Sequence, residues 1–175
     1  DEYDLWKDTM LIVNTDHGFL LGEHDWWGKS IMPAYEEISH TPLFIYDPVS
    51  RIQNRRRMQL TSAIDIPATI LDFHGLEIPG HSLLPVIREN QKVRDTALFG
   101  FHASHVAITD GRYTYFRAPL YTQESNCYEY TLMPTRMRRP YSVETLRSAV
   151  LADPLPNSKG CPVLKTKSEI CYVSP

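Results

Sequence analysis

Three side chains near the start of the chain have the types and spacing to bind a cation and an anion together. Asp16 and His17 are adjacent, and Lys29 follows twelve residues after His17. A carboxylate beside an imidazole offers an oxygen and a nitrogen donor to a divalent ion. An ammonium group folded back to that ion would contact the oxygens of a metal-bound sulfate or phosphate. Asp-His-Gly alone is more typical of a turn, in which the aspartate bonds its own backbone.

The residues before this tripeptide predict a strand that would carry it. Thr9–Thr15 is an apolar run that ends in polar residues, and Pro42–Tyr46 is a second short run, closed by Asp47. Neither run alternates, which is typical of strands buried on both faces of a parallel sheet. Ligands of such sheets collect at the carboxyl ends of the strands, where Asp16 and His17 stand.

Local signals predict a helix and a hairpin farther along the chain. Asp65 can cap a helix that has Pro67 in its first turn and ends at Gly75. Asp110-Gly111 lies between two strand-like segments and is the strongest hairpin signal in the sequence. We therefore expect an α/β chain with a parallel part followed by a smaller antiparallel part.

The parallel part is expected to be incomplete. Two buried strands and one or two helices cannot cover both faces of a parallel sheet. We therefore expect the chain to expose an apolar face, or to cover that face with other residues of the protein or with a second copy in a homo-oligomer.

Composition places the chain in the globular class, with 42% hydrophobic and 22% charged residues. It has no run of about 18 apolar residues, so no transmembrane helix is expected. The net charge of −3 gives no general attraction to nucleic acid or to a membrane surface. The first 48 residues hold ten acidic and two basic residues, which suits either a cation site or a solvated face.

The cysteines and the opening residues lead to two further expectations. Three cysteines without a CxxC pair favour reduced thiols over a disulfide framework, so we expect a cytoplasmic protein. The chain opens with neither an initiator methionine nor a leader sequence and soon enters a strand pattern. We therefore expect a fragment of a longer chain.

Several ordered blocks of the sequence resemble the C-terminal half of a type I sulfatase. This branch of the alkaline phosphatase superfamily also includes phosphonate monoester hydrolases and related phosphodiesterases. The resemblance covers most of residues 9–120. Its blocks are TDHG at 15–18, LLGEHDWWGKS at 20–30, YEEISHTPLFIYDP at 35–48, SAIDIPATILDFHGLEIPGHSLL at 62–84 and ITDGRYTYFRAP at 108–119.

The resemblance implies a role for each candidate residue. Asp16 and His17 would be ligands of the active-site cation, which would be calcium in a sulfatase, or manganese or zinc in a phosphonate hydrolase. Lys29 would contact the sulfuryl or phosphoryl oxygens during catalysis. By their positions in the chain, His24 and His105 are further candidates for substrate binding; the alternatives are that His24 stabilises its loop and that His105 is a solvated loop residue. Many sulfatases have Asn where this chain has His17, so the resemblance leaves the metal and the ester class open.

The resemblance also implies a fold and a division of the chain. Residues 1–85 would be the C-terminal part of an alkaline-phosphatase-like parallel sheet domain. Residues 86–175 would form a small C-terminal α+β subdomain with an antiparallel hairpin.

The family's nucleophile is a formylglycine made from the Cys or Ser of a C/S-x-P-x-R motif, and this sequence has no such motif. We expect that nucleophile in an N-terminal half of the same protein, so the chain alone should be inactive. For the whole protein we expect hydrolysis of a sulfate ester of a small molecule or sugar. The alternatives are a phosphonate monoester or phosphodiester hydrolase, and a non-catalytic binding or assembly module.

Overall fold

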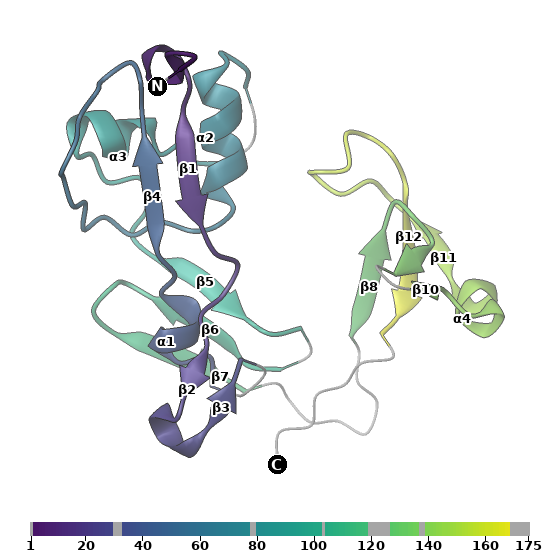
Figure 1. The fold of residues 1–175 in the computed structure, drawn as a ribbon. Helices are drawn as coiled ribbons and strands as arrows, with labels where there is room; N and C mark the ends of the chain where they lie inside the picture. Colours follow the sequence, from purple (N-terminus) through teal and green to yellow (C-terminus); the bar gives the residue numbers. More distant parts are fainter. Residues whose placement is uncertain are drawn as a thin grey trace. The chain divides into compact units, whose positions relative to one another are not determined.

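The computed structural model describes residues 2–29, 33–77, 80–102, 104–118, 127–136 and 139–168 (Figure 1). These residues form two compact units. Unit 1 comprises Asp1–Phe101 and His105–Arg117, and unit 2 comprises His102–Ser104 and Ala118–Pro175. The resemblance predicts a different kind of division, at residue 85, between the catalytic domain and the C-terminal subdomain of the family. The compact units do not test that division, so it stays a prediction.

Unit 1 is built from short strands and helices. Its 3₁₀ turns are η1 (Leu5–Lys7) and η2 (Glu23–Asp25), and its helices are α1 (Glu36–Ser39), α2 (Asp65–Phe73) and α3 (Leu84–Glu89). Its strands are β1 (Leu11–Asn14), β2 (Leu20–Leu21), β3 (Trp27–Gly28), β4 (Leu43–Tyr46), β5 (Ala97–Gly100), β6 (Val106–Thr109) and β7 (Thr114–Arg117).

The two apolar runs form strands, but the expected parallel pairing is wrong. β1 and β4 pair antiparallel, with Leu11 opposite Tyr46 and Asn14 opposite Leu43. The β2–β3 hairpin and α1 lie between them and return the chain in the opposite direction (Figure 1). All strand pairs in the described residues are antiparallel, so the observed fold is mixed α/β with small antiparallel sheets.

Burial of these strands on both faces is also not observed. Leu11, Val13 and Phe44 share one face of the β1–β4 pair and are 45%, 51% and 67% exposed. Side chains opposite each other in an antiparallel pair lie on the same face, so Val13 and Phe44 form one continuous apolar patch with Leu11. The pattern therefore predicted apolar strands correctly, but among the described residues Leu11, Val13 and Phe44 on this face stay largely uncovered, while Tyr46 on the same face contacts the ring of Trp6.

The local predictions of a helix and a hairpin are confirmed. α2 ends before Gly75, whose φ of 72° lies in the left-handed region that stops a helix. β6 and β7 close around Asp110-Gly111, with Thr109 paired to Thr114. Asp65 does not cap as expected, because it is the first residue of α2 and its carboxylate accepts the backbone N–H of Ser62 at 2.8 Å.

Unit 2 holds two further antiparallel sheets. Its elements are β8 (Tyr128–Thr131), β9 (Thr135–Arg136), β10 (Arg139–Pro140), α4 (Val143–Ser148), β11 (Val150–Ala152) and β12 (Val163–Lys167). Three of the strands are ordered β11–β12–β8, and β9 pairs with β10. Ser142 begins α4 by accepting the N–H of Thr145 at 3.1 Å, the bond that an N-cap serine makes. No helix of the described residues is long and apolar enough to cross a membrane.

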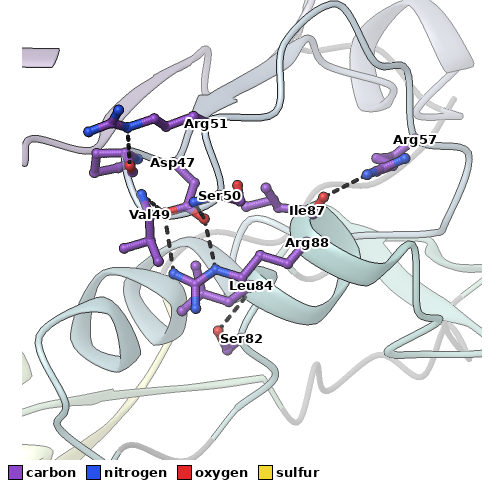
Figure 2. Close-up of polar contacts among 10 residues, drawn as sticks. Asp47, Val49, Ser50, Arg51, Arg57, Ser82, Leu84, Ile87 and Arg88 are labelled. Atoms are coloured by element: carbon purple, nitrogen blue, oxygen red, sulfur yellow. Dashed lines mark hydrogen bonds and ion pairs between the residues drawn. The ribbon is translucent and has the colours of Figure 1, made fainter. Parts of the chain in front are cut away.

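A buried ion pair fixes the end of β4 against α3. The side chain of Asp47 is completely buried, and Arg88 donates to its two oxygens at 2.7 and 3.2 Å (Figure 2). The backbone N–H groups of Val49 and Ser50 donate to the same carboxylate. Burial would raise the pKa of Asp47, but the Arg88 guanidinium and these N–H groups outweigh it and lower the pKa to about 2.

Arginines of the 51–57 segment bond to the protein itself. Arg57 donates to the carbonyl of Ile87 on α3 at 2.7 Å, and Arg51 donates to the carbonyl of Pro48 (Figure 2). A second buried carboxylate, that of Asp65, pairs with Arg94. Charged contacts between distant parts of the chain therefore fix the loops around α2 and α3.

We expect Asp47→Asn to lower the free energy of unfolding by about 2 kcal/mol near neutral pH, the amount linked to a fall in pKa of this size. Because the pKa is lower in the folded state, this stabilisation is complete well above the ordinary value of 3.8 and is lost as the pH falls through about 2. Urea unfolding of both proteins near pH 7 and near pH 2 measures the difference.

Asp95→Asn is the matched control, because Asp95 is exposed and pairs with Lys92 on the surface. Its loss should cost less than about 0.5 kcal/mol. An equal difference between wild type and Asp47→Asn at both pH values would contradict this account of the ion pair.

Candidate functional site

The chain bends at Asp16, which Thr15 separates from the end of β1, and we call Asp16, His17 and Gly18 the turn. The carboxylate of Asp16 accepts the backbone N–H of His17 at 3.0 Å, and the hydroxyl of Thr15 donates to the carbonyl of His17 at 3.2 Å. The bond from the aspartate to its own backbone that the tripeptide predicts is therefore present, at a bend of the chain. The side chains of the turn nevertheless stay available, because the carboxylate of Asp16 is 81% exposed.

The charge of Asp16 is favoured by its neighbours. The loss of some surrounding water acts to raise its pKa, but the adjacent His17 ring and the backbone N–H of His17 outweigh this and lower the pKa. The carboxylate is therefore ionised at neutral pH, which is the form that binds a cation.

The hydrogen bonds of His17 assign its two ring nitrogens different roles. Nδ1 lies 2.8 Å from the carbonyl oxygen of Gly18. A carbonyl only accepts, so Nδ1 carries a proton. Nε2 points the other way and lies 3.3 Å from the Asp16 carboxylate. An imidazole held by an Nδ1–H bond to a backbone carbonyl presents Nε2 in the orientation used by metal-ligating histidines.

The β2–β3 hairpin returns Lys29 to this turn. Leu20 pairs with Gly28 and Leu21 with Trp27, and Lys29 follows directly. Its Nζ lies 2.6 Å from Nε2 of His17. The structure therefore brings together Asp16, His17 and Lys29, the three residues that the sequence singled out first.

A close backbone contact fixes the turn against α1. The N–H of Gly18 donates to the carbonyl of Ile38 at 2.8 Å. A Cβ atom at position 18 would overlap the carbonyl oxygen of Glu37. Only glycine allows this approach, so the placement of His17 depends on the position of α1 as well as on β1.

His24 lies in the same hairpin but contacts α1. Its ring stacks on Tyr35 with centroids 3.7 Å apart, and Nε2 lies 3.4 Å from the carboxylate of Glu37. Its φ of 55° is left-handed, as is the φ of 62° at Asp25, so the hairpin turns sharply here. His24 therefore connects the hairpin that carries Lys29 to α1, and it is not joined to Asp16 or His17 by a hydrogen bond.

His105 is placed elsewhere in unit 1. It is half-buried and precedes β6, where its carbonyl accepts the N–H of Phe101. It does not belong to the group formed by Asp16, His17 and Lys29. The roles of His24 and His105 in substrate binding stay predictions.

The donors present suit a divalent cation but make only part of a site. They are one carboxylate and one imidazole nitrogen, and the described residues contain no group of three His, Cys, Asp or Glu side chains that would hold a metal ion. An ammonium group contacts the imidazole nitrogen instead. Asp16 and His17 therefore fit a metal ion for which further ligands come from elsewhere.

The sequence did not reveal the supporting residues Gly18, Tyr35 and Glu37. Their partners lie 11 to 20 residues away in the chain. Tyr35 precedes and Glu37 lies within a helix of only four residues, whose pattern is too short to indicate which side chain faces the hairpin. The only local signal was glycine itself at position 18, next to the candidate ligands.

Comparisons with known proteins give the family. Residues 22–150, more than half of the chain, match the family described as N-sulphoglucosamine sulphohydrolase, C-terminal. This range includes His24, Lys29 and His105 but begins after Asp16 and His17. No solved structure gives a significant match.

Curated relatives match over shorter parts of their own length. An arylsulfatase of Clostridium perfringens is 32% identical over 120 residues, covering 62% of this chain and 24% of the relative. An N-acetylglucosamine-6-O-sulfatase of Bacteroides thetaiotaomicron is 36% identical, covering 49% and 16%. The multifunctional alkaline phosphatase superfamily protein PehA of Trinickia caryophylli is 38% identical, covering 52% and 18%.

The chain thus spans between 16% and 24% of the length of these relatives. The family match includes the hairpin that carries Lys29, the short helix α1 against which Gly18 packs, and the strand β4 that pairs with β1. The resemblance seen in the sequence is confirmed: the chain belongs to the sulfatase family and corresponds to the C-terminal region of its members.

Proposed function

We propose that this chain supplies one side of the active site of a metal-dependent sulfuric ester hydrolase. The observation that carries the proposal is the group formed by Asp16, His17 and Lys29, with Nζ of Lys29 2.6 Å from Nε2 of His17. In this proposal Asp16 and His17 are metal ligands and Lys29 binds the ester's anionic oxygens. Membership of the sulfatase family supports this assignment.

Each residue has a distinct task in the proposed site. Asp16 offers an ionised oxygen, and His17 offers Nε2 because Gly18 holds its Nδ1 proton. A divalent cation, calcium if the protein is a true sulfatase, would supply Lewis-acid stabilisation of the sulfuryl oxygens. Lys29 would neutralise negative charge that builds on the same oxygens as the alcohol leaves. Its present contact with His17 supports this role, since it brings the ammonium group beside the ligands.

The rest of the site is proposed to come from an N-terminal half of the same protein. That half would contribute the formylglycine nucleophile and further metal ligands. The apolar patch of Leu11, Val13 and Phe44 supports this, because it gives additional strands a surface on which to pack. A second copy of the chain is the alternative cover for the patch.

Hydrolysis of phosphonate monoesters or phosphodiesters is the second candidate activity. The imidazole of His17 favours it, because nitrogen ligands suit manganese or zinc better than calcium. The similarity to PehA, a multifunctional member of the superfamily, points in the same direction.

Lys29 tests the proposed reaction in the protein expressed with its N-terminal half. We expect hydrolysis of an aryl sulfate to exceed that of the matched aryl phosphonate. Lys29→Ala should lower kcat/KM for the sulfate by about 100-fold, the loss typical of a group that stabilises a developing anion. Steady-state kinetics with both esters measure the effect.

Lys92→Ala is the control, because Lys92 is a surface cation paired with Asp95, and its removal should leave kcat/KM unchanged. Faster hydrolysis of the phosphonate would replace the sulfatase proposal by the second candidate. Unchanged kinetics for Lys29→Ala would remove Lys29 from the catalytic site.

Metal binding by residues 1–175 alone should be weak. With one carboxylate and one imidazole we expect a calcium Kd no tighter than about 10⁻⁴ M. Isothermal titration calorimetry measures it. Asp16→Asn should abolish the remaining binding, whereas Asp8→Asn, at an exposed position before β1, should not. Submicromolar affinity would mean that the chain holds ligands beyond Asp16 and His17.

A further inference from the structure

The three-stranded sheet of unit 2 has two faces of opposite character. Tyr130 of β8 lies opposite Lys165 of β12, and Tyr128 lies opposite Lys167. Opposite residues of an antiparallel pair share a face, so these four side chains lie on the same side of the sheet. We call this surface the Tyr–Lys face.

The opposite face of the sheet is covered where β8 pairs with β12, although Leu151 of β11 on the same face is 74% exposed. Glu129 and Thr166 are paired there, and Thr166 is 1% exposed. The carboxylate of Glu129 accepts hydrogen bonds from Tyr141 at 3.4 Å and from Ser168 at 3.1 Å. His102 contacts the hydroxyl of Ser168 at 3.0 Å. This network holds β8 in register, so the tyrosines of β8 are directed to the other face.

The Tyr–Lys face is open to solvent. Tyr128 and Tyr130 are 42% and 47% exposed, and Lys167 is exposed. Because Tyr128 and Tyr130 are two positions apart on one strand, their Cα atoms lie about 7 Å apart along it. Nζ of Lys165 lies 4.0 Å from the centroid of the Tyr128 ring and 5.8 Å from that of Tyr130. Both distances fall within the range of cation–π attraction.

The charge of this face is positive. Glu129 is the only acidic residue of β8, β11 and β12, and its register directs it to the covered face. Unit 2 carries seven basic and five acidic residues, a net charge of +2, whereas unit 1 carries eleven basic and sixteen acidic residues, a net charge of −5. An anionic ligand is therefore attracted to unit 2 more than to the rest of the chain.

We propose that the Tyr–Lys face binds a sulfated saccharide. The rings of Tyr128 and Tyr130 offer flat apolar surfaces to the C–H face of a sugar ring. Lys165 and Lys167 supply ammonium groups for its sulfate. The choice of sulfate as the anion rests on the proposed function, whereas the aromatic and cationic pairing rests on unit 2 alone. The face would hold part of a sulfated glycan without taking part in hydrolysis.

The test uses residues 1–175 with a sulfated heparin tetrasaccharide and the same tetrasaccharide after desulfation. We expect NMR titration to shift the backbone amides of Tyr128, Tyr130, Lys165 and Lys167. The Lys165→Gln/Lys167→Gln variant should raise the Kd at least about tenfold, as expected when two ionic contacts are lost. Desulfation of the ligand should weaken binding to a similar extent.

Two substitutions serve as matched controls. Lys159→Gln removes a cation from the loop before β12. Tyr113→Leu removes an exposed tyrosine of unit 1. The Tyr113 ring also forms a cation–π pair, with its centroid 5.0 Å from Cζ of Arg112. Neither should change the Kd. Tyr130→Leu, in contrast, should raise it several-fold, because a leucine side chain offers no flat ring for the sugar.

The outcomes separate this inference from the proposed function. Shifts confined to His17 and Lys29, or equal affinity for the desulfated ligand, would overturn the inference while leaving the hydrolase proposal standing. If the saccharide binds to the Tyr–Lys face but the full-length protein hydrolyses no sulfate ester, the inference stands and the hydrolase proposal fails. If the double variant fails to fold, the chemical-shift changes of the wild-type chain show whether the saccharide binds to the Tyr–Lys face.

Discussion

The buried carboxylate of Asp47 is the constraint on which unit 1 depends. An ionised group without solvent is costly unless it is fully bonded, and here Arg88 and two backbone N–H groups supply the bonds. Because Asp47 follows β4 and Arg88 lies on α3, the pair fixes the end of β4 to the helical part of the unit. β4 in turn pairs with β1, and β1 leads directly into Asp16 and His17. The positions of Asp16 and His17 thus depend on a series of contacts that begins at the ion pair of Asp47 and Arg88.

The candidate site forms from a short stretch of chain. The two short strands β2 and β3 form a hairpin that returns Lys29 to His17, and the short helix α1 supports both the turn and this hairpin. The contacts use different chemistry: the backbone of Gly18, the ring of Tyr35 and the carboxylate of Glu37. The local fold therefore positions an ammonium group, an imidazole and a carboxylate together, even though Leu11, Val13 and Phe44 of β1 and β4 are largely uncovered in the part of the chain that the structure describes. A site whose parts are pre-arranged in this way loses less entropy when its remaining ligands arrive.

The sequence predicted those features whose causes are local. Gly75 marks the end of α2 and Asp110-Gly111 marks a hairpin because their backbone conformations are decided by one or two residues. The juxtaposition of Lys29 and His17 also followed from the ordered motifs. Strand direction did not, because apolar runs such as Thr9–Thr15 report burial but not which strand pairs with which. Asp47 ended a strand in the sequence, but its partner Arg88 lies 41 residues later, and no local pattern connects them.

The contact of Gly18 with α1 has a consequence for how this region tolerates change. The atoms that exclude a side chain at position 18 belong to the main-chain carbonyl of Glu37, and the hydrogen bond ends at that of Ile38. Main-chain carbonyls are the same in every amino acid. Sequence variation in α1 therefore leaves this contact intact, as long as the helix forms, whereas position 18 admits only glycine. For this contact only position 18 is restricted to one amino acid. Related sequences can therefore keep the geometry of the turn while the residues of α1 change.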